Sequence, residues 1–489
     1  MRFLLDTNVL IPLEDSQLPL EPSLASFVRL AHSHGHPLLY HPASEDDIRE
    51  DKNIDRRNQT LQRLEQYERL DARPECPWNA EGMRVNDSRD NEILYALSLN
   101  AANGLVTEDR GIHDKAKARG IANRVYTIQT ANDLLRRLHR EVVLSLPNVV
   151  EVPLYSLTPQ LGSKFFDSLR DAYPFDEWFA KKAQAGVRAW ISNDEAGKVG
   201  AICIYDRQTR ERITDDLVLP GDALKLSTFK VGDTHRGRKI GELFLKAAFR
   251  YASEHGLEHI FVHGDMDKHH FLFDLLVDFG FEYVGSHPGS NGRDAVYLKQ
   301  HPVLPPEPTA PHLEYHRKYF PHFCSGPEVA KFVVPIRPEF HRILFPDYQS
   351  IADQQEDMFP VENYAGNAIK MAYLSHAQTK SIDPGSVLLF YRSGDDQALT
   401  SIGVVESYEQ LSDPDAIIAK VKRRTVYTLA DIQKMAAKPT RVLLFRFVRH
   451  LSRAIPFSEL THHRVLNGHP QSLTSISHDA FQSALAIGG

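Results

Sequence analysis

The chain starts with MRFLLDTNVLIPLE (residues 1–14), in which a carboxylate interrupts an apolar run. Residues 3–5 favour a buried strand, and the apolar pattern resumes at residues 9–11. Asp6, between the two runs, has two explanations. It caps a helix that begins near Thr7, or it is a charged ligand at the carboxyl end of a strand. The pattern that follows decides between them.

Short apolar runs alternate with helical patterns from this point to about residue 145. Strands separated by helices predict a parallel α/β sheet, in which sites form at the carboxyl ends of the strands. The expected strands are RFLLDT (2–7), PLLYHP (37–42), GLVTED (104–109) and RVYTI (124–128), and the expected helices are SLASFVRLAHSHG (23–35), TLQRLEQYERL (60–70) and NEILYALSLNAANG (91–104).

Four aspartates border these elements. Asp6 ends the first strand, and Asp109 ends the run LVTED. Asp90 lies at or near the start of a helix, and Asp47 lies in SEDDIRED after the second strand. Mg²⁺ and Mn²⁺ prefer hard oxygen ligands, and two such ions can stabilise the attacking and leaving oxygens of a phosphodiester. Carboxylates that converge from four separate elements would supply such a site.

This block resembles the PIN-domain ribonuclease superfamily. The matching segments are LLDTNVLI (4–11), Asp47-Ile48, DNEIL (90–94) and LVTED (105–109). The resemblance implies that the catalytic, Mg²⁺- or Mn²⁺-binding residues are Asp6, Asp47, Asp90 and Asp109, with Asn8 and Thr107 as polar neighbours. The family usually has Glu where this chain has Asp47. Each aspartate taken singly is also explained as a cap or turn residue, so the prediction depends on the set and its order.

Composition places the chain among ordinary globular proteins. Its 489 residues suggest about three domains. No run approaches the roughly 18 apolar residues of a membrane span, and Asp6 breaks any signal-peptide core. Three widely separated cysteines favour a reducing compartment, so a cytoplasmic location without membrane attachment is expected. The net charge of −7 means that nucleic-acid binding must depend on local basic patches.

Proline marks the clearest boundary. The segment HPVLPPEPTAPHLE (301–314) contains five prolines, which favours an extended spacer. A softer boundary lies at residues 144–159. The predicted domains are therefore 1–145, 150–300 and 315–489, with 301–314 as the linker.

The middle domain contains a sequence pattern that favours the binding of an anion. A strand runs into the basic, Gly-containing loop GDTHRGRKIG (232–241), which opens the helix ELFLKAAFRYASEHG (242–256). Free N–H groups and the positive end of a helix dipole attract phosphates. Arg236 and Arg238 add charge, while Gly237 and Gly241 allow a ligand to approach the backbone.

In its context, this loop resembles that of the GNAT acetyltransferase superfamily, through LSTFKVGDTHRGRKIGELFLKAAF (226–249) and LLVDFGF (275–281). The resemblance implies a mixed α+β domain in which acetyl-coenzyme A binds. Backbone groups of Phe229 and Val231 would hold the pantetheine arm, and the pyrophosphate would lie on Arg236, Gly237, Arg238, Lys239, Ile240 and Gly241.

Two positions depart from the GNAT pattern. Lys239 stands where the family commonly has Gly, and Leu276 stands where a Tyr general acid is common. The base for the acceptor amine is left open between His263 and Asp265. A degenerate domain that senses coenzyme A or acts as a spacer is the alternative to an active one.

The C-terminal domain predicts a helix within residues 365–380 and three strands, SVLLFYRS (386–393), LTSIGVVES (399–407) and TRVLLFRFVRHL (440–451). Short strands joined by turns suggest a small β-barrel. PGSVLLFYRS…TSIGVVE resembles the PUA-like superfamily, which includes ASCH and EVE domains and commonly holds a nucleic-acid base.

Residues 420–453 contain ten Lys or Arg residues and one acidic residue, Asp431. With Tyr427, Phe445 and Phe447 interleaved, this composition suits single-stranded RNA. The alternative is that these aromatics belong to the core.

These patterns predict an RNA-directed multidomain enzyme. Its N-terminal domain would be a metal-dependent endoribonuclease, and its middle domain would transfer the acetyl group of acetyl-coenzyme A to an amine. Expected partners are RNA, tRNA included, and a second copy of the chain. One alternative is an N-acetyltransferase for a small-molecule or protein amine whose flanking domains serve recognition only. The other is a binding module in which neither site turns over.

Overall fold

The computed structural model describes residues 1–14, 21–80, 82–139, 149–171, 173–194, 196–232, 235, 239–290, 292–345, 348, 369–421, 424 and 427–489. They form two compact units. The first comprises Met1–Val143 with Gln410–Val442, and the second comprises Leu144–Glu409 with Leu443–Gly489. A segment from the C-terminal part of the chain therefore packs with the N-terminal part.

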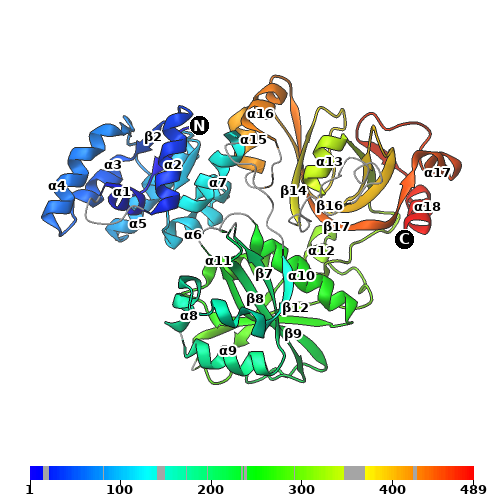
Figure 1. The fold of residues 1–489 in the computed structure, drawn as a ribbon. Coiled ribbons are helices and arrows are strands. Elements are labelled where there is room, and N and C mark those ends of the chain that lie inside the picture. Colours follow the sequence, from blue (N-terminus) through cyan, green and yellow to red (C-terminus); the bar gives the residue numbers. More distant parts are fainter. Residues whose placement is uncertain are drawn as a thin grey trace. The chain divides into compact units, whose positions relative to one another are not determined.

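A five-stranded parallel sheet forms the centre of the first unit, in the order β3-β2-β1-β4-β5 (Figure 1). Its strands are β1 (Phe3–Leu5), β2 (Leu38–Tyr40), β3 (Glu68–Arg69), β4 (Gly104–Val106) and β5 (Val125–Tyr126). The helices are α1 (Thr7–Glu14), α2 (Pro22–Ser33), α3 (Pro42–Arg49), α4 (Ile54–Arg63), α5 (Val85–Ser98), α6 (Arg110–Ala118), α7 (Ile128–His139), α15 (Pro414–Val421) and α16 (Leu429–Ala436). The predicted parallel α/β sheet is confirmed.

The central strand β1 explains the opening segment. Its three residues are fully buried, which removes apolar surface from water on both faces of the sheet. The helix α1 begins at Thr7, and its first backbone hydrogen bonds run to the carbonyl of Asp6. Asp6 therefore occupies both predicted places, the carboxyl end of a strand and the start of a helix.

A seven-stranded mixed sheet forms part of the second unit, in the order β11-β12-β10-β9-β8-β7-β6. The strands are β6 (Val150–Pro153), β7 (Arg188–Asn193), β8 (Val199–Thr209), β9 (Asp222–Val231), β10 (His259–Asp265), β11 (Glu282–Ser286) and β12 (Asp294–Gln300), with α8 (Asp167–Arg170), α9 (Phe175–Gln184), α10 (Ile240–Glu254) and α11 (His270–Asp278). β9 and β10 pair in parallel, and the other neighbours are antiparallel.

Helices cover the two faces of this sheet differently. Leu243 and Phe244 of α10 and Leu276 of α11 pack with Ile260 and Val262 on one face of β10. On the opposite face, α9 packs against β7 and β8. The apolar spacing of the predicted helix 242–256 is what directs α10 onto the sheet.

The second unit also holds a six-stranded mixed sheet, in the order β14-β17-β16-β15-β13-β18. Its elements are β13 (Lys331–Ile336), β14 (Lys370–Ser375), β15 (Val387–Arg392), β16 (Ala398–Leu411), β17 (Thr440–Pro456) and β18 (Thr474–Ile476), with α12 (His312–Tyr319), α13 (Pro338–Leu344), α17 (Phe457–His462) and α18 (His478–Gly488). The helix expected within 365–380 is wrong over β14. The barrel stays a prediction. No helix in the described ranges is long and apolar enough to cross a bilayer.

An ion cluster joins the two sheets of the second unit. Asp278, at the end of α11, accepts a hydrogen bond from Arg446 Nη2 at 2.9 Å and another from the ammonium of Lys370. Arg446 is almost completely buried and also faces Glu406 at 3.7 Å. Burial opposes the charged form of Asp278, yet Lys370 and Arg446 hold the pKa of this carboxyl below its usual range.

We expect Asp278→Ala to destabilise the second unit, because it leaves the buried guanidinium of Arg446 with one carboxylate fewer. The expected loss is about 2 kcal/mol of unfolding free energy, measured by denaturant titration. Asp216→Ala, which removes an exposed carboxylate of the same unit, is the control. Equal stability of the two variants would show that the cluster contributes nothing.

Candidate functional site

Asp6 lies at the carboxyl end of β1 and is nearly completely buried. The hydroxyl of Thr107 donates a hydrogen bond to Asp6 Oδ2 at 2.7 Å. Burial, with smaller contributions from the charges of Asp90 and Asp109, raises the pKa of Asp6 to about 6 against the effect of the Thr107 hydrogen bond. Three of the four predicted carboxylates therefore lie close enough to influence one another.

Thr107 is the centre of the hydrogen bonds at this sheet edge. Its fully buried hydroxyl oxygen accepts from Asn8 Nδ2 at 3.1 Å and from the backbone N–H of Asp109 at 3.0 Å. Asn8 Oδ1 accepts from the backbone N–H of Glu108 at 3.1 Å. The turn after β1 is thereby fixed to the turn after β4, which positions Asp6 beside Asp109.

Cations bind two of the predicted carboxylates, Asp47 and Asp90. Arg89 Nη1 donates to Asp47 Oδ1 at 2.6 Å and to Glu50 Oε2 at 2.8 Å. Lys115 Nζ donates to Asp90 Oδ2 at 2.8 Å. Burial raises the pKa of both Asp47 and Asp90, and the paired cations oppose that shift. In this arrangement each aspartate shares its cation with a second carboxylate, Glu50 in the case of Asp47 and Asp87 in the case of Asp90.

The expected position of Asp90 at a helix start is wrong. The helix α5 begins five residues earlier, at Val85, and Asp90 lies in its second turn. The segment from 86 to 92 is polar, so its apolar spacing starts only at Ile93 and does not show where the helix begins.

The metal expected here was tested against the donors present. Carboxylate oxygens are of the type that Mg²⁺ and Mn²⁺ take. Within the described ranges, however, no group of three or more His, Cys, Asp or Glu side chains is arranged to hold a metal ion. In this structure Arg89 and Lys115 engage two of the four aspartates. The four-carboxylate metal site stays a prediction.

A second candidate site lies where β9 and β10 separate. Their parallel pairing covers only Ala223–Leu226 with His259–Val262. Beyond these residues β9 continues to Val231 and β10 to Asp265, paired with their outer neighbours β8 and β12. A β-bulge in the β8–β9 pairing, between Ile204 and Tyr205, accompanies the separation. The sheet is thus open between two parallel strands.

Backbone groups of β9 point into this opening. The N–H of Gly232 bonds to the carbonyl of Gly200 at 2.9 Å, directly opposite on β8. In an antiparallel pair, hydrogen-bonded and non-bonded positions alternate. Phe229 and Val231 therefore direct their N–H and C=O groups away from β8 and toward β10. These are the two residues that the sequence predicted to offer backbone groups to a pantetheine arm.

The loop after β9 ends at a strained residue. Lys239 has φ +59°, a left-handed conformation that favours Gly, the residue common here in the resembling family. Its Nζ donates to the carbonyl of Lys370 at 2.7 Å. Ile240 begins α10, and a Cβ on Gly241 would come within 2.7 Å of Leu275 Cδ2. The predicted pyrophosphate residues Arg236, Gly237 and Arg238 lie outside the described residues.

The open strands and the start of α10 fit an extended, anionic cofactor. An acyl-pantetheine arm carries amide groups that can pair with a strand edge, and a helix N-terminus suits a pyrophosphate. Lys239, Ile240 and Gly241 are in place at that helix start. This fit depends on backbone geometry, which sequence periodicity does not report.

The basic C-terminal segment does not present its aromatics for stacking. Tyr427, Phe445 and Phe447 are all buried, which confirms the alternative that they belong to the core. Arg446 is buried as well. Lys434 and Lys438 are exposed, so the charge is available without the interleaved rings.

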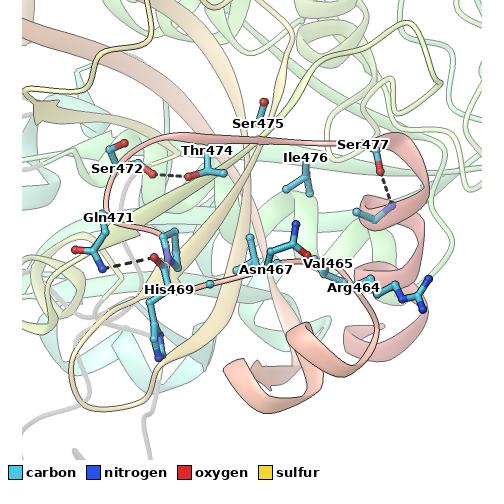
Figure 2. A pocket seen from close by; sticks show the side chains of 14 residues that line it. Arg464, Val465, Asn467, His469, Gln471, Ser472, Thr474, Ser475, Ile476 and Ser477 are labelled. Atoms are coloured by element: carbon cyan, nitrogen blue, oxygen red, sulfur yellow. Dashed lines mark hydrogen bonds between the residues drawn. The ribbon is translucent and has the colours of Figure 1, made fainter.

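A polar hollow of about 490 Å³ lies near the C-terminus (Figure 2). Residues 464–472, β18 and the first turns of α18 line it. Hydrogen bonds stabilise the wall of this hollow. In one of them Thr474 Oγ1 donates to the carbonyl oxygen of Ser472 at 2.9 Å. None of the predicted site residues contributes to this hollow.

Comparisons with known proteins bear on the second site. Residues 154–281 match the acetyltransferase (GNAT) family, and this span includes β9, the loop and the start of α10. No curated protein matches the chain. The open strands therefore lie in a GNAT acetyltransferase domain, whose family uses acetyl-coenzyme A.

Among solved structures, two cover about a third of the chain each. The ASCH protein from Zymomonas mobilis is 14% identical, with 32% of this chain and 96% of that chain covered and a TM-score of 0.26. A GNAT-family acetyltransferase from Listeria monocytogenes is 18% identical, with 30% of this chain and 81% of that chain covered and a TM-score of 0.21. No functional argument is based on these likenesses.

Thr107→Val should lower the unfolding free energy of the first unit by about 2 kcal/mol, because it removes the donor to the buried carboxylate of Asp6. Thr60→Val is a matched control. Thr60 is fully buried in the same unit, and its hydroxyl has no hydrogen-bond partner among the described residues. We expect that variant to be neutral or stabilising in urea titrations. A similar loss in both variants would contradict the role given to Thr107.

Proposed function

We propose that this protein is an acetyl-coenzyme A-dependent N-acetyltransferase whose site lies between β9 and β10. The observation that carries the proposal is the separation of these strands within the segment that matches the GNAT family. Acetyl-coenzyme A supplies an activated acetyl thioester when it is bound. The residues of the chain bind and orient it and receive the proton that the acceptor amine loses.

Each part of the site has a role in binding. Phe229 and Val231 provide backbone hydrogen bonds to the pantetheine amides, which fixes the thioester along β9. Lys239, Ile240 and Gly241 hold the pyrophosphate at the N–H groups of the start of α10. The family resemblance implies the same role for Arg236, Gly237 and Arg238, which lie outside the described residues. Gly241 suits this position because α11 leaves no room for a Cβ without movement of Leu275.

Wild-type protein should bind acetyl-coenzyme A in a calorimetric titration, and Val231→Pro should bind it about tenfold more weakly. Proline removes the N–H that faces the opening but no bond to β8, and tenfold corresponds to about one hydrogen bond. Val231→Ala keeps the N–H and is the control. Equal affinity of the proline and alanine variants, with both folded by circular dichroism, would contradict the binding mode.

RNA cleavage by the first unit is a second candidate function. Its support is that Asp90 and Asp109 lie near Asp6 at the carboxyl end of β1, where their charges add to the larger effect of burial in raising the pKa of Asp6. In this version the PIN-like block cuts RNA and the PUA-like block recognises it. In the alternative version both flanking blocks only recognise the substrate of the acetyltransferase. The homodimer expected from the sequence is part of the nuclease proposal.

The nuclease proposal is tested with total tRNA and Mn²⁺ on a sequencing gel. Discrete cuts by wild-type protein should disappear with Asp6→Asn, because the variant loses the carboxylate at the strand end. Asp55→Asn removes an exposed carboxylate of the same unit and should leave the cuts unchanged. Absence of cutting by wild-type protein, or unchanged cutting by Asp6→Asn, would contradict this function.

A further inference from the structure

The residue that follows the last β9–β10 pair is a histidine. The pairing ends at Val262, so His263 is the first residue of β10 beside the opening. Side chains alternate along a strand. Val262 faces α10 and α11, whereas Phe261 packs on the opposite face with Val296 and Ile213. His263 shares the face of Phe261 and thus lies away from the two helices.

A carboxylate orients this histidine. His263 Nδ1 lies 3.3 Å from Asp294 Oδ2 on β12. The ring of His287 stacks on that of His263, with centroids 4.0 Å apart and an interplanar angle of 16°. The other ring nitrogen, Nε2, has no hydrogen-bond partner in the described part of the chain. A carboxylate at Nδ1 favours the tautomer with the proton there, which leaves the lone pair on Nε2.

The surroundings keep the imidazole neutral at pH 7. Burial first, then the charges of Lys225 and His287, lower the pKa of His263 to about 4 against the effect of Asp294. Lys225 lies on the same face of β9, opposite Phe261. A lowered pKa means that the neutral form is present above about pH 4. The ring is therefore neutral, with its lone pair present, throughout the physiological range, although the lowered pKa makes it a weaker base than an ordinary histidine.

Asp265 is the other candidate base from the sequence. One oxygen of its carboxylate already accepts hydrogen bonds from the backbone. Asp265 Oδ1 accepts hydrogen bonds from the backbone N–H groups of Asp267 at 3.0 Å and Lys268 at 3.4 Å. These bonds form the turn after β10. His269 lies near the same carboxylate and that of Asp294. Asp265 thus serves the turn and adds negative charge beside the opening.

We propose that His263 is the general base for a primary-amine acceptor and that Asp294 is its positioning residue. The inference depends on the acetyltransferase function proposed above. The ammonium first gives one proton to solvent, and the neutral amine nitrogen then forms a bond to the acetyl carbonyl carbon as His263 Nε2 takes a second proton. The carbon–sulfur bond breaks, and coenzyme A leaves as a thiolate that gains a proton from solvent. The proton on His263 then returns to solvent, so atoms and charge balance.

The geometry also indicates the class of acceptor. Acetyl-coenzyme A would enter along β9 from the α10 side, and the acceptor must reach the thioester from the face that carries His263. The carboxylates of Asp265 and Asp294 attract a cationic ammonium to that face, against the repulsion of Lys225 on the same face. A primary amine that arrives protonated and loses its protons at the site matches this chemistry.

The test compares wild type with His263→Gln, His263→Ala and Asp294→Asn. Thiol release from acetyl-coenzyme A is followed with spermidine, a lysine-containing peptide and aminoacyl-tRNA as acceptors. We expect kcat to fall about 100-fold for both His263 variants and about tenfold for Asp294→Asn, with acetyl-coenzyme A affinity by calorimetry unchanged. Added imidazole should restore part of the activity of His263→Ala. His255→Gln, an exposed histidine of the same domain, is the control.

The outcomes separate the two claims. If wild type acetylates one of these amines and the His263 variants keep its kcat, the inference is overturned and the proposed function stands. The inference is also overturned, and the proposed function stands, if the activity of His263→Ala falls and added imidazole does not restore any of it. If wild type acetylates none of them, the transfer function fails and the inference fails with it.

Discussion

The separation of β9 from β10 is the constraint on which the account depends. A strand inside a sheet normally satisfies its backbone groups on both edges, and unpaired polar groups away from water cost free energy. Here the inner edge of β9 is left open over its last residues, beside the end of β10 and the start of α10. An extended ligand that carries amides and ends in phosphates satisfies both features at once.

The two faces of the sheet beside this opening have different roles. The helices α10 and α11 bury one face of β10 through Ile260 and Val262, which leaves the other face to His263. The end of α11 is tied through Asp278 to the six-stranded sheet, and Lys239 bonds to the carbonyl of Lys370 in that sheet. The start of α10 is therefore positioned in part by residues far away in the sequence.

Much of this fold could be predicted from local pattern. The parallel sheet of the first unit, the helix α10 and the strands β15, β16 and β17 follow from apolar runs and helical spacing. The strand β14 was taken for a helix because Lys370–Ser375 has apolar residues at spacings that suit either. The aromatics of β17 could not be placed, since alternation alone does not say which face is buried.

The site residues were harder to predict than the fold, because their roles depend on contacts between elements that are distant in the sequence. The resemblance of the strand and its Gly-containing loop to a known family singled out Phe229 and Val231, and their role toward a pantetheine arm stays a prediction. His263 could not be chosen over Asp265, because its partner Asp294 lies on a strand that was not predicted. Nor did spacing show that Arg89 and Lys115 would pair with two of the aspartates, since ion pairs between elements depend on tertiary packing.

Residue-resolved hydrogen exchange of β9, with and without saturating acetyl-coenzyme A, tests the proposed site most directly. The amides of Phe229 and Val231 should exchange more slowly in the complex. The amides of Thr228 and Lys230, which face β8, should change little. Unchanged exchange at Phe229 and Val231 under saturating acetyl-coenzyme A would contradict the proposed site.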